Sequence, residues 1–267
     1  MELLNRRKGV LVMGILNTTP DSFYAGGRYA STDAAVAHGQ LLAEDGADII
    51  DIGGESSRPG SAPVGVEEEI RRTLPVIKRL STTNTSLSID TCRPEVAEAG
   101  VVAGAAMIND ITGLANPKML EIAARYHVPA VIMHMQGSPR TMQDNPTYSD
   151  VVGEVKEFLS QRAKAASQHG VRQVVLDPGI GFGKNLQHNL QLLKNLGQIK
   201  SLGYPVLVGP SRKSFIGAIT GQPAGQRLEG TIAACILAAA NGADILRVHD
   251  VKAVKSALAV ADAIISA

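Results

Sequence analysis

Three polar residues that could recognise a flat heterocycle each stand directly after a short apolar run. They are Asp90, Asn109 and Asp177. Amide and carboxylate side chains suit a ring that presents amino and ring N–H donors together with carbonyl acceptors. A single residue of this kind is usually a hydrogen-bonded group of the core, and for Asp177 that interpretation stays open. Three of them at the same end of separate runs favour a binding site.

Basic residues stand at the same end of the last two apolar runs. Ser211, Arg212 and Lys213 follow one run, and Arg247 and His249 belong to the other. Side chains two apart on a strand share a face, so Arg247 and His249 are expected to point the same way. This grouping predicts an anion site, although Arg212 could instead be a solvated surface charge and His249 a core histidine.

Asn17 ends the first apolar run and could bind Mg²⁺ through one side-chain oxygen. Mg²⁺ gives up its water reluctantly and is often held by one or two protein oxygens together with substrate phosphate. The sequence has no cluster of Asp, Glu and His that predicts a metal cage, and no Ser-His-Asp or Cys-His pattern that predicts a nucleophile. The glycines of 176–184 fit neither a dinucleotide-binding motif nor a P-loop.

The elements that position these residues alternate regularly along the chain. Eight short apolar runs, typical of parallel strands buried on both faces, are separated by stretches with helical periodicity. Side chains at the C-terminal ends of such strands converge on one rim of a (β/α)8 barrel, where active sites of this fold lie. We therefore predict an α/β protein with a single (β/α)8 TIM-barrel domain over residues 1–267 and long rim loops at 18–30 and 53–66. The helices between the strands are expected at 33–44, 67–80, 94–103, 117–126, 149–169, 186–196, 226–241 and 252–265.

Composition argues against several classes of partner. The formal net charge is +1, which predicts no binding to nucleic acid or to an anionic membrane. Cys92 and Cys235 match no metal-ligand spacing and are expected to be free thiols in a reducing cytoplasm. No stretch is long and apolar enough to span a bilayer, and the N-terminal apolar run lacks the cleavage site of a signal peptide.

Eight motifs resemble the dihydropteroate synthase family over nearly the whole chain. They are GILNTTPDSF (14–23), DIGGESSRPG (51–60), SIDT (88–91), NDITG (109–113), MHMQG (133–137), LDPGIGFGK (176–184), GPSRKSFIG (209–217) and RVHDV (247–251). The resemblance implies a barrel enzyme that condenses 6-hydroxymethyl-7,8-dihydropterin diphosphate with 4-aminobenzoate, releasing diphosphate, in folate synthesis. It also implies Mg²⁺ as the cofactor and a homodimer, and the Ala-rich stretches 231–240 and 253–263 would allow close helix packing in such a dimer.

The resemblance implies three groups of site residues. The pterin is held by Asp90, Asn109, Met133, Asp177 and Lys213. Diphosphate is held by Asn17, Arg58, Arg247 and His249, with Asn17 also binding the metal. Aminobenzoate is enclosed by Phe23, Ser57, Arg58, Pro59, Phe182 and Ser211. The catalytic residues are expected to be Asp90, Lys213, Arg247 and His249.

Two other functions stay open. A related pterin-binding methyltransferase would share the pterin pocket, but it has no use for a diphosphate site, so the basic residues favour the synthase. A non-catalytic paralogue is kept open by Tyr24 and Ala25, which replace the Ser-Asp that is common in the family. Since the sequence offers no nucleophile and no obvious general base, it favours a dissociative displacement. Diphosphate leaves, a pterin cation forms beside Asp90, and aminobenzoate attacks the cation.

Overall fold

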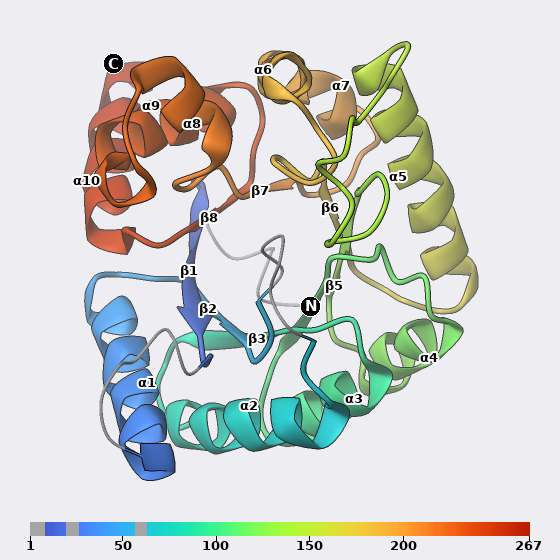
Figure 1. Cartoon of the computed structure of the whole chain (residues 1–267), viewed down its shortest axis with the longest axis vertical. Coiled ribbons are helices and arrows are strands. Elements are labelled where there is room, and N and C mark those ends of the chain that lie inside the picture. Colours follow the sequence, from blue (N-terminus) through green and yellow to red (C-terminus); the bar gives the residue numbers. More distant parts are fainter. Residues whose placement is uncertain (1–8, 20–26, 57–62) are drawn as a thin grey trace.

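The computed structural model describes residues 9–19, 27–56 and 63–267, which form the predicted (β/α)8 barrel (Figure 1). Its strands are β1 (Leu11–Asn17), β2 (Ile49–Gly53), β3 (Ser86–Asp90), β4 (Met107–Asp110), β5 (Ala130–Met133), β6 (Val174–Asp177), β7 (Leu207–Val208) and β8 (Ile245–Val248). They form one sheet in the order β6-β5-β4-β3-β2-β1-β8-β7, and the paired strands are parallel. A bridge between Leu176 and Val206 brings β6 to β7 and closes the ring.

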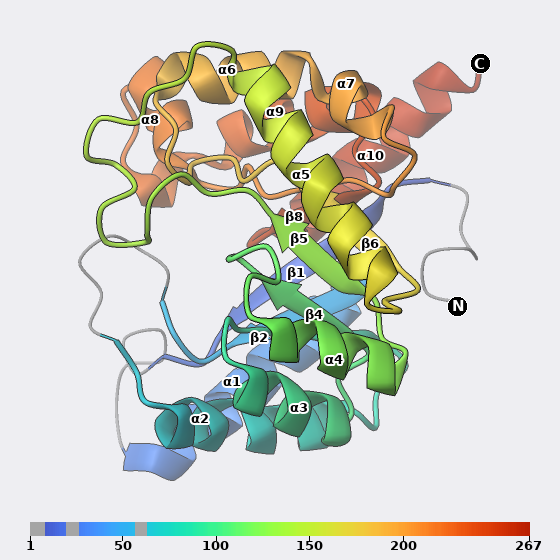
Figure 2. The same ribbon diagram turned by 90° about the vertical axis from the view of Figure 1, so that its right-hand side faces the viewer.

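Helices cover the outside of this ring. They are α1 (Gly27–Glu44), α2 (Val66–Leu80), α3 (Pro94–Val102), α4 (Pro117–Tyr126), α5 (Val151–Gln168), α6 (Leu186–Lys194), α7 (Leu196–Lys200), α8 (Ser214–Thr220), α9 (Leu228–Ala240) and α10 (Val251–Ile265), with a 3-10 turn at Ala224–Gln226. In Figure 2, α1 to α4 lie on one side of the strands, and α5 to α10 lie on the other. No helix of the described residues is long and apolar enough to cross a membrane.

The strands separate two hydrophobic cores. The larger one lies between the outer face of the sheet and the helices. The smaller one fills the barrel interior and consists of Leu11, Met13, Ile49, Met107, Val131, Val175, Leu207 and Ile245. These residues come from the N-terminal parts of their strands, so they make an apolar floor under the C-terminal rim. Polar side chains at that rim are thereby held above a rigid, dry base.

Some element boundaries differ from the prediction. The first rim loop was expected at 18–30, but α1 begins at Gly27, so the predicted loop is wrong from that residue onward. Ser31 and Thr32, which look like capping residues in the sequence, lie inside the helix, because local propensity is weaker than tertiary packing. The short helices α7 and α8 were not predicted, since one or two turns carry too little periodicity to be recognised.

Candidate active site

The C-terminal rim brings all five expected pterin residues into one cleft. Asp90, Met133 and Asp177 are the last residues of β3, β5 and β6, and Asn109 is the last but one of β4. Asp90 and Asn109 lie side by side in register, as do Met133 and Asp177. The cleft is lined by Asp90, Asn109, Ile111, Met133, Asp177, Ile180, Phe182, Gly209, Lys213 and Arg247. The strand ends therefore assemble a site from residues far apart in the sequence.

Arg247 links two carboxylates across the mouth of the barrel. Its Nε donates to Asp51 Oδ2 at 2.6 Å, and its Nη2 donates to Asp90 Oδ2 at 2.6 Å. Asn109 Nδ2 also donates to Asp51 Oδ2, at 2.9 Å. Arg247 was expected beside diphosphate, whereas the structure places its guanidinium among the carboxylates of the cleft. Asp51 was not predicted, although it is the only charged residue inside the run 49–52.

The two carboxylates of the cleft have raised pKa values. Burial raises the pKa of Asp90 to about 7; Arg247 opposes this effect, while Asp51, Glu69 and Asp110 add to it. Burial likewise raises the pKa of Asp177 to about 6, against the hydrogen bond from Gly179 and the charge of Lys213. Because both pKa values are raised toward neutrality, the charge of the cleft is sensitive to small changes around it.

The glycine-rich turn after β6 completes one wall of the cleft. Asp177 Oδ1 accepts a hydrogen bond from Gly179 N at 2.7 Å, which leaves Oδ2 for a ligand. Gly179 has φ +68°, and a Cβ there would stand 1.9 Å from the carbonyl oxygen of His134. Any other side chain at this position would push the turn off β5. The turn ends with Phe182, whose ring lies 4.1 Å from Lys213 Nζ.

A buried lysine holds this turn from beneath. Lys184 is 2% exposed, and its Nζ donates to the carbonyl oxygen of Phe182 at 2.8 Å and lies 3.0 Å from His134 Nδ1. Burial lowers the pKa of Lys184 to about 7, and burial together with Lys184 lowers the pKa of His134 to about 3. His134 is therefore neutral and can accept from the lysine. Sequence reasoning missed Lys184, because a lysine after a glycine-rich turn first suggests a phosphate ligand.

Three of the residues expected at the anion site after β7 and β8 make two separate sets of contacts: Ser211 with His249, and Arg212 with Asp250. Ser211 Oγ lies 2.9 Å from His249 Nδ1, and His249 N donates back to Ser211 Oγ at 3.2 Å. Arg212 points away and pairs with Asp250, at 3.0 Å from Nε and 2.6 Å from Nη2. Ser211 and His249 thus form one unit beside the cleft, and Arg212 is a surface charge, the alternative left open from the sequence.

The expected metal and loop residues are only partly described. Asn17 ends β1, where its backbone pairs with Gly53 of β2. Within 9–19, 27–56 and 63–267, no group of three or more His, Cys, Asp or Glu side chains could hold a metal ion. A metal here would need Asn17 together with oxygens of a substrate and water. Four other expected residues lie outside the described residues: Phe23, Ser57, Arg58 and Pro59.

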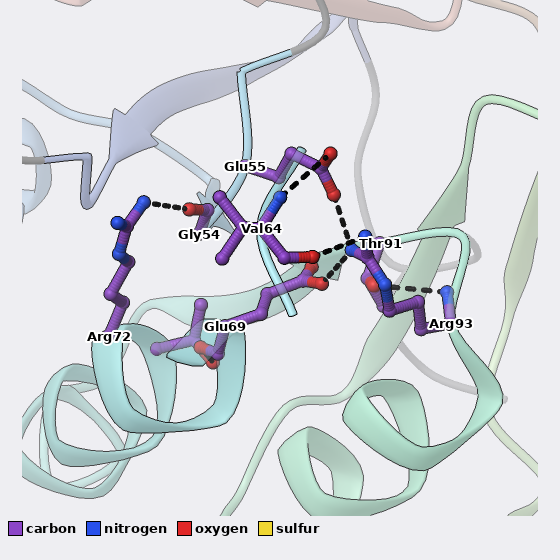
Figure 3. Close-up of polar contacts among 8 residues, drawn as sticks. Gly54, Glu55, Val64, Glu69, Arg72, Thr91 and Arg93 are labelled. Carbon is purple, nitrogen blue, oxygen red and sulfur yellow. Dashed lines mark hydrogen bonds and ion pairs between the residues drawn. The ribbon is translucent and has the colours of Figure 1, made fainter. Parts of the chain in front are cut away.

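Arg93, which follows β3, contacts Glu55 and Val64, the residues on either side of the segment 57–62 (Figure 3). Its guanidinium pairs with Glu55 and with Glu69 of α2, and its Nη2 donates to the carbonyl oxygen of Val64 at 2.5 Å. Glu55 Oε1 also accepts from Val64 N, at 3.4 Å. Glu55 and Val64 are therefore joined both directly and through Arg93. This cluster could not be predicted from the sequence, because its members are separated by up to 38 residues.

Cys92, which was expected to be a free thiol, lies in the same region. Its thiol lines a cavity shared with Asp90 and Ile111, and burial raises its pKa to about 11. A thiol that stays protonated at neutral pH is a poor nucleophile. Cys92 is therefore a packing residue, and both cysteines of the chain are free.

The cluster around Arg93 makes a testable prediction about stability. Arg93→Gln removes the cation that compensates Glu69, which is only 1% exposed. We expect the free energy of unfolding to fall by roughly 3 kcal/mol, as when one partner of a buried ion pair is removed.

The control is Arg125→Gln, whose pair with Glu98 is 61% and 39% exposed and should contribute less than about 1 kcal/mol. Urea denaturation of the two variants measures the difference. Equal losses would show that the Arg93 cluster is no stronger than a surface ion pair.

Comparisons with known proteins agree with this geometry. The family model for pterin binding enzymes matches residues 13–249. Dihydropteroate synthase from Synechocystis sp. is 48% identical over 262 residues, which cover 96% of this chain and 91% of that protein. The structure of Xanthomonas albilineans dihydropteroate synthase with 4-aminobenzoic acid has a TM-score of 0.92 at 51% identity, covering 97% of this chain and 94% of the other. The structure of Thermus thermophilus dihydropteroate synthase in complex with 6HMPPP has a TM-score of 0.85 at 43% identity. The match covers 99% of this chain and 96% of the other. The chain belongs to the dihydropteroate synthase family of pterin-binding enzymes.

Proposed function

We propose that this chain condenses 6-hydroxymethyl-7,8-dihydropterin diphosphate with 4-aminobenzoate, and that it does so by dissociative displacement of diphosphate. The condensation follows from family membership, since relatives with this fold were solved with 4-aminobenzoic acid, with 7,8-dihydropteroate and with 6HMPPP. The observation that carries the proposal is the cleft in which Asp90, Asn109, Asp177 and Lys213 converge. It makes the chain a transferase of folate synthesis.

The hydrogen-bonding groups of the cleft fit the edge of a pterin ring. Asp177 keeps Oδ2 for a ligand, and Asp90 keeps Oδ1, because their other oxygens are bonded to Gly179 and Arg247. These acceptors suit the amino and ring N–H donors of the heterocycle, while Lys213 can donate to its carbonyl oxygen. Met133, which is 3% exposed, offers a polarisable surface for the ring face.

The reaction needs charge stabilisation more than a nucleophile. The C–O bond between the pterin methylene and diphosphate breaks with its electron pair leaving on diphosphate, and the cation is shared by the ring. Asp90 stabilises that cation, since preorganised charge is most effective in a site closed to water. The aminobenzoate nitrogen then forms the new C–N bond and loses a proton. His249, whose Nδ1 contacts Ser211 Oγ, is proposed to donate to the departing diphosphate through its other ring nitrogen.

Mg²⁺ fits the proposal as a partner of diphosphate. Asn17 would hold it through one side-chain oxygen, with diphosphate and water supplying the other ligands. When bound, the ion would neutralise charge on the leaving group. Aminobenzoate is proposed to lie against Phe182 and Ser211 on the side of the cleft where Lys213 covers the Phe182 ring. Phe23, Ser57, Arg58 and Pro59 are proposed to complete that pocket, with Arg58 also contacting diphosphate.

One assay separates the synthase from the other functions. The purified chain should form dihydropteroate from pterin diphosphate, aminobenzoate and Mg²⁺, and a chelator should abolish turnover. A methyltransferase would form none and would instead transfer a methyl group to a corrinoid protein. A non-catalytic paralogue would bind the pterin without turnover.

We also propose a cytoplasmic homodimer that contacts no nucleic acid or membrane. A reducing compartment suits Cys92 and Cys235, which are unpaired. The helices α9 and α10 lie together in Figure 1. Both expose large apolar side chains. Leu237 is 62% exposed, Val260 60% and Ile264 71%. A second copy of the chain would cover these side chains.

The charge of the cleft predicts a pH dependence. If Asp90 must be ionised to stabilise the cation, activity is lost as the pH falls through its raised pKa of about 7. We expect kcat/KM for pterin diphosphate to rise with pH and to level off above that value. A profile that is flat between about pH 5.5 and 8 would contradict this role for Asp90.

The donor and acceptor pattern predicts the effect of Asp177→Asn. The variant can keep an oxygen toward Gly179 N but turns an NH2 group toward the donors of the ring. Pterin affinity, measured by calorimetry, should fall by about 1–3 kcal/mol.

The matched control is Asp110→Asn. Asp110 is a buried carboxylate at the end of β4 whose oxygens accept from Thr112 and Leu114 in its own turn. Because the charge of Asp110 also raises the pKa of Asp90, the two affinities are compared well above that pKa of about 7, where Asp90 is ionised. There Asp110→Asn should leave pterin affinity unchanged, and equal losses in both variants would mean that Asp177 is structural.

The dimer is tested by light scattering. The chain should scatter as twice the 28.0 kDa of one copy at micromolar concentration, and Leu237→Glu should shift it toward the single mass, because a buried charge opposes association. A wild-type mass of one copy would contradict the dimer.

A further inference from the structure

Asp51 is the most deeply buried charge of the site, and it lies below the residues expected to touch substrate. It stands in the middle of β2, is 0% exposed, and has Ile15 and Ser88 as its register neighbours on β1 and β3. One oxygen, Oδ2, accepts from both Arg247 Nε and Asn109 Nδ2. A single carboxylate oxygen thus ties β8 to β4 across the barrel.

The first consequence concerns the amide of Asn109. An Asn side chain can present either an oxygen or an NH2 group to a ligand, and the two look alike in shape. Because Asn109 Nδ2 is bonded to Asp51, its Oδ1 is turned the other way. The charge of Asp51 fixes this choice, since an amide oxygen facing a carboxylate oxygen would be repelled. Asn109 is thereby set as a hydrogen-bond acceptor beside Asp90 and Asp177.

The second consequence concerns Arg247. Its guanidinium plane is fixed at two points, Nε on Asp51 and Nη2 on Asp90, so it cannot rotate out of the cleft without breaking both bonds. In the same arrangement, the carboxylates of Asp51 and Asp90 share the single positive charge of Arg247. The charges that face Asp90 are Arg247 from β8, Asp51 from β2, Glu69 from α2 and Asp110 from β4. Asp51 therefore influences Asp90 both through Arg247 and directly.

We propose that Asp51 is the positioning residue of the pterin site: it touches no substrate, sets Asn109 as an acceptor and holds Arg247 against Asp90. This inference rests on the proposed function and adds to it a residue that acts only through others. Two buried oxygens, Asp51 Oδ1 and Ser88 Oγ, have no hydrogen-bond partner among the described residues. Because Oδ1 makes no hydrogen bond that would be lost, Asp51→Asn can keep the shape of the site while it removes the charge.

The test compares two substitutions of Asp51. Asp51→Leu removes the acceptor, so Asn109 can turn over and Arg247 keeps only Asp90. We expect kcat/KM for pterin diphosphate to fall about 10- to 100-fold. Asp51→Asn can keep an oxygen toward Arg247 and turn its amide toward Ser88. It should recover most of the activity at alkaline pH, while the acidic limb of the kcat/KM profile moves to lower pH, because a charge that raises the pKa of Asp90 is gone.

Asp48→Asn is the matched control on the same stretch of chain. Asp48 is a buried carboxylate just before β2 that accepts from Val12 N at 2.8 Å and pairs with Lys255 at 2.5 Å, at the opposite end of the barrel. Its variant should lose stability without a change in the KM for pterin diphosphate or in the pH profile. All kinetics are referred to the folded fraction measured by circular dichroism.

The outcomes separate this inference from the proposed function. A wild-type chain that forms no dihydropteroate overturns the function itself. A normal wild type with Asp51→Leu within about threefold of it, or with Asp51→Asn showing an unmoved acidic limb, overturns the positioning role. If Asp51→Leu does not fold, the position of the acidic limb in the kcat/KM profile of Asp51→Asn is the test of the positioning role.

Discussion

The ion pairs of the half-buried Arg247 with Asp51 and Asp90 are the interaction on which the rest of the site depends. Two carboxylates facing each other in a barrel would repel without a cation, and an arginine there would be costly without carboxylates. Together they form a charged group at the mouth that keeps one excess negative charge when Asp90 is ionised. That excess would stabilise the pterin cation of the mechanism that we propose.

The barrel supplies the rigidity that makes such a group useful. The apolar floor excludes water from below, so the charges above it interact strongly. Lys184 holds the glycine-rich turn to His134, and Arg93 holds the chain around Glu55 and Val64 to the end of β3. In each case a basic side chain that is buried or half-buried makes several hydrogen bonds to the segment that it holds. The site therefore consists of a central charged group, with Lys184 and Arg93 holding the segments at its edge.

The sequence predicted most of the fold but only part of the site. Asp90, Asn109 and Asp177 could be found because the ends of apolar runs mark the rim of a parallel barrel. Asp51 could not be assigned in this way, because its role depends on the contacts that it makes with β4 and β8 across the barrel. Lys184 could not be assigned either, because its role depends on how the glycine-rich turn folds back onto His134. The start of α1 was missed because Ser31 and Thr32, which suggest the start of a helix in the sequence, lie inside it. The pairing of Ser211 with His249, rather than of His249 with Arg247, likewise depends on where β8 ends.

We propose that the substrate binds to a group of charges that is already formed in the free protein. A crystal structure of the chain with bound pterin diphosphate is the decisive measurement. We expect the ring between Asp90, Asn109 and Asp177, with Arg247 Nε still on Asp51 and Asn109 Nδ2 unmoved. A ring bound outside this cleft, or an Arg247 that has left Asp51 to reach the ligand, would contradict it.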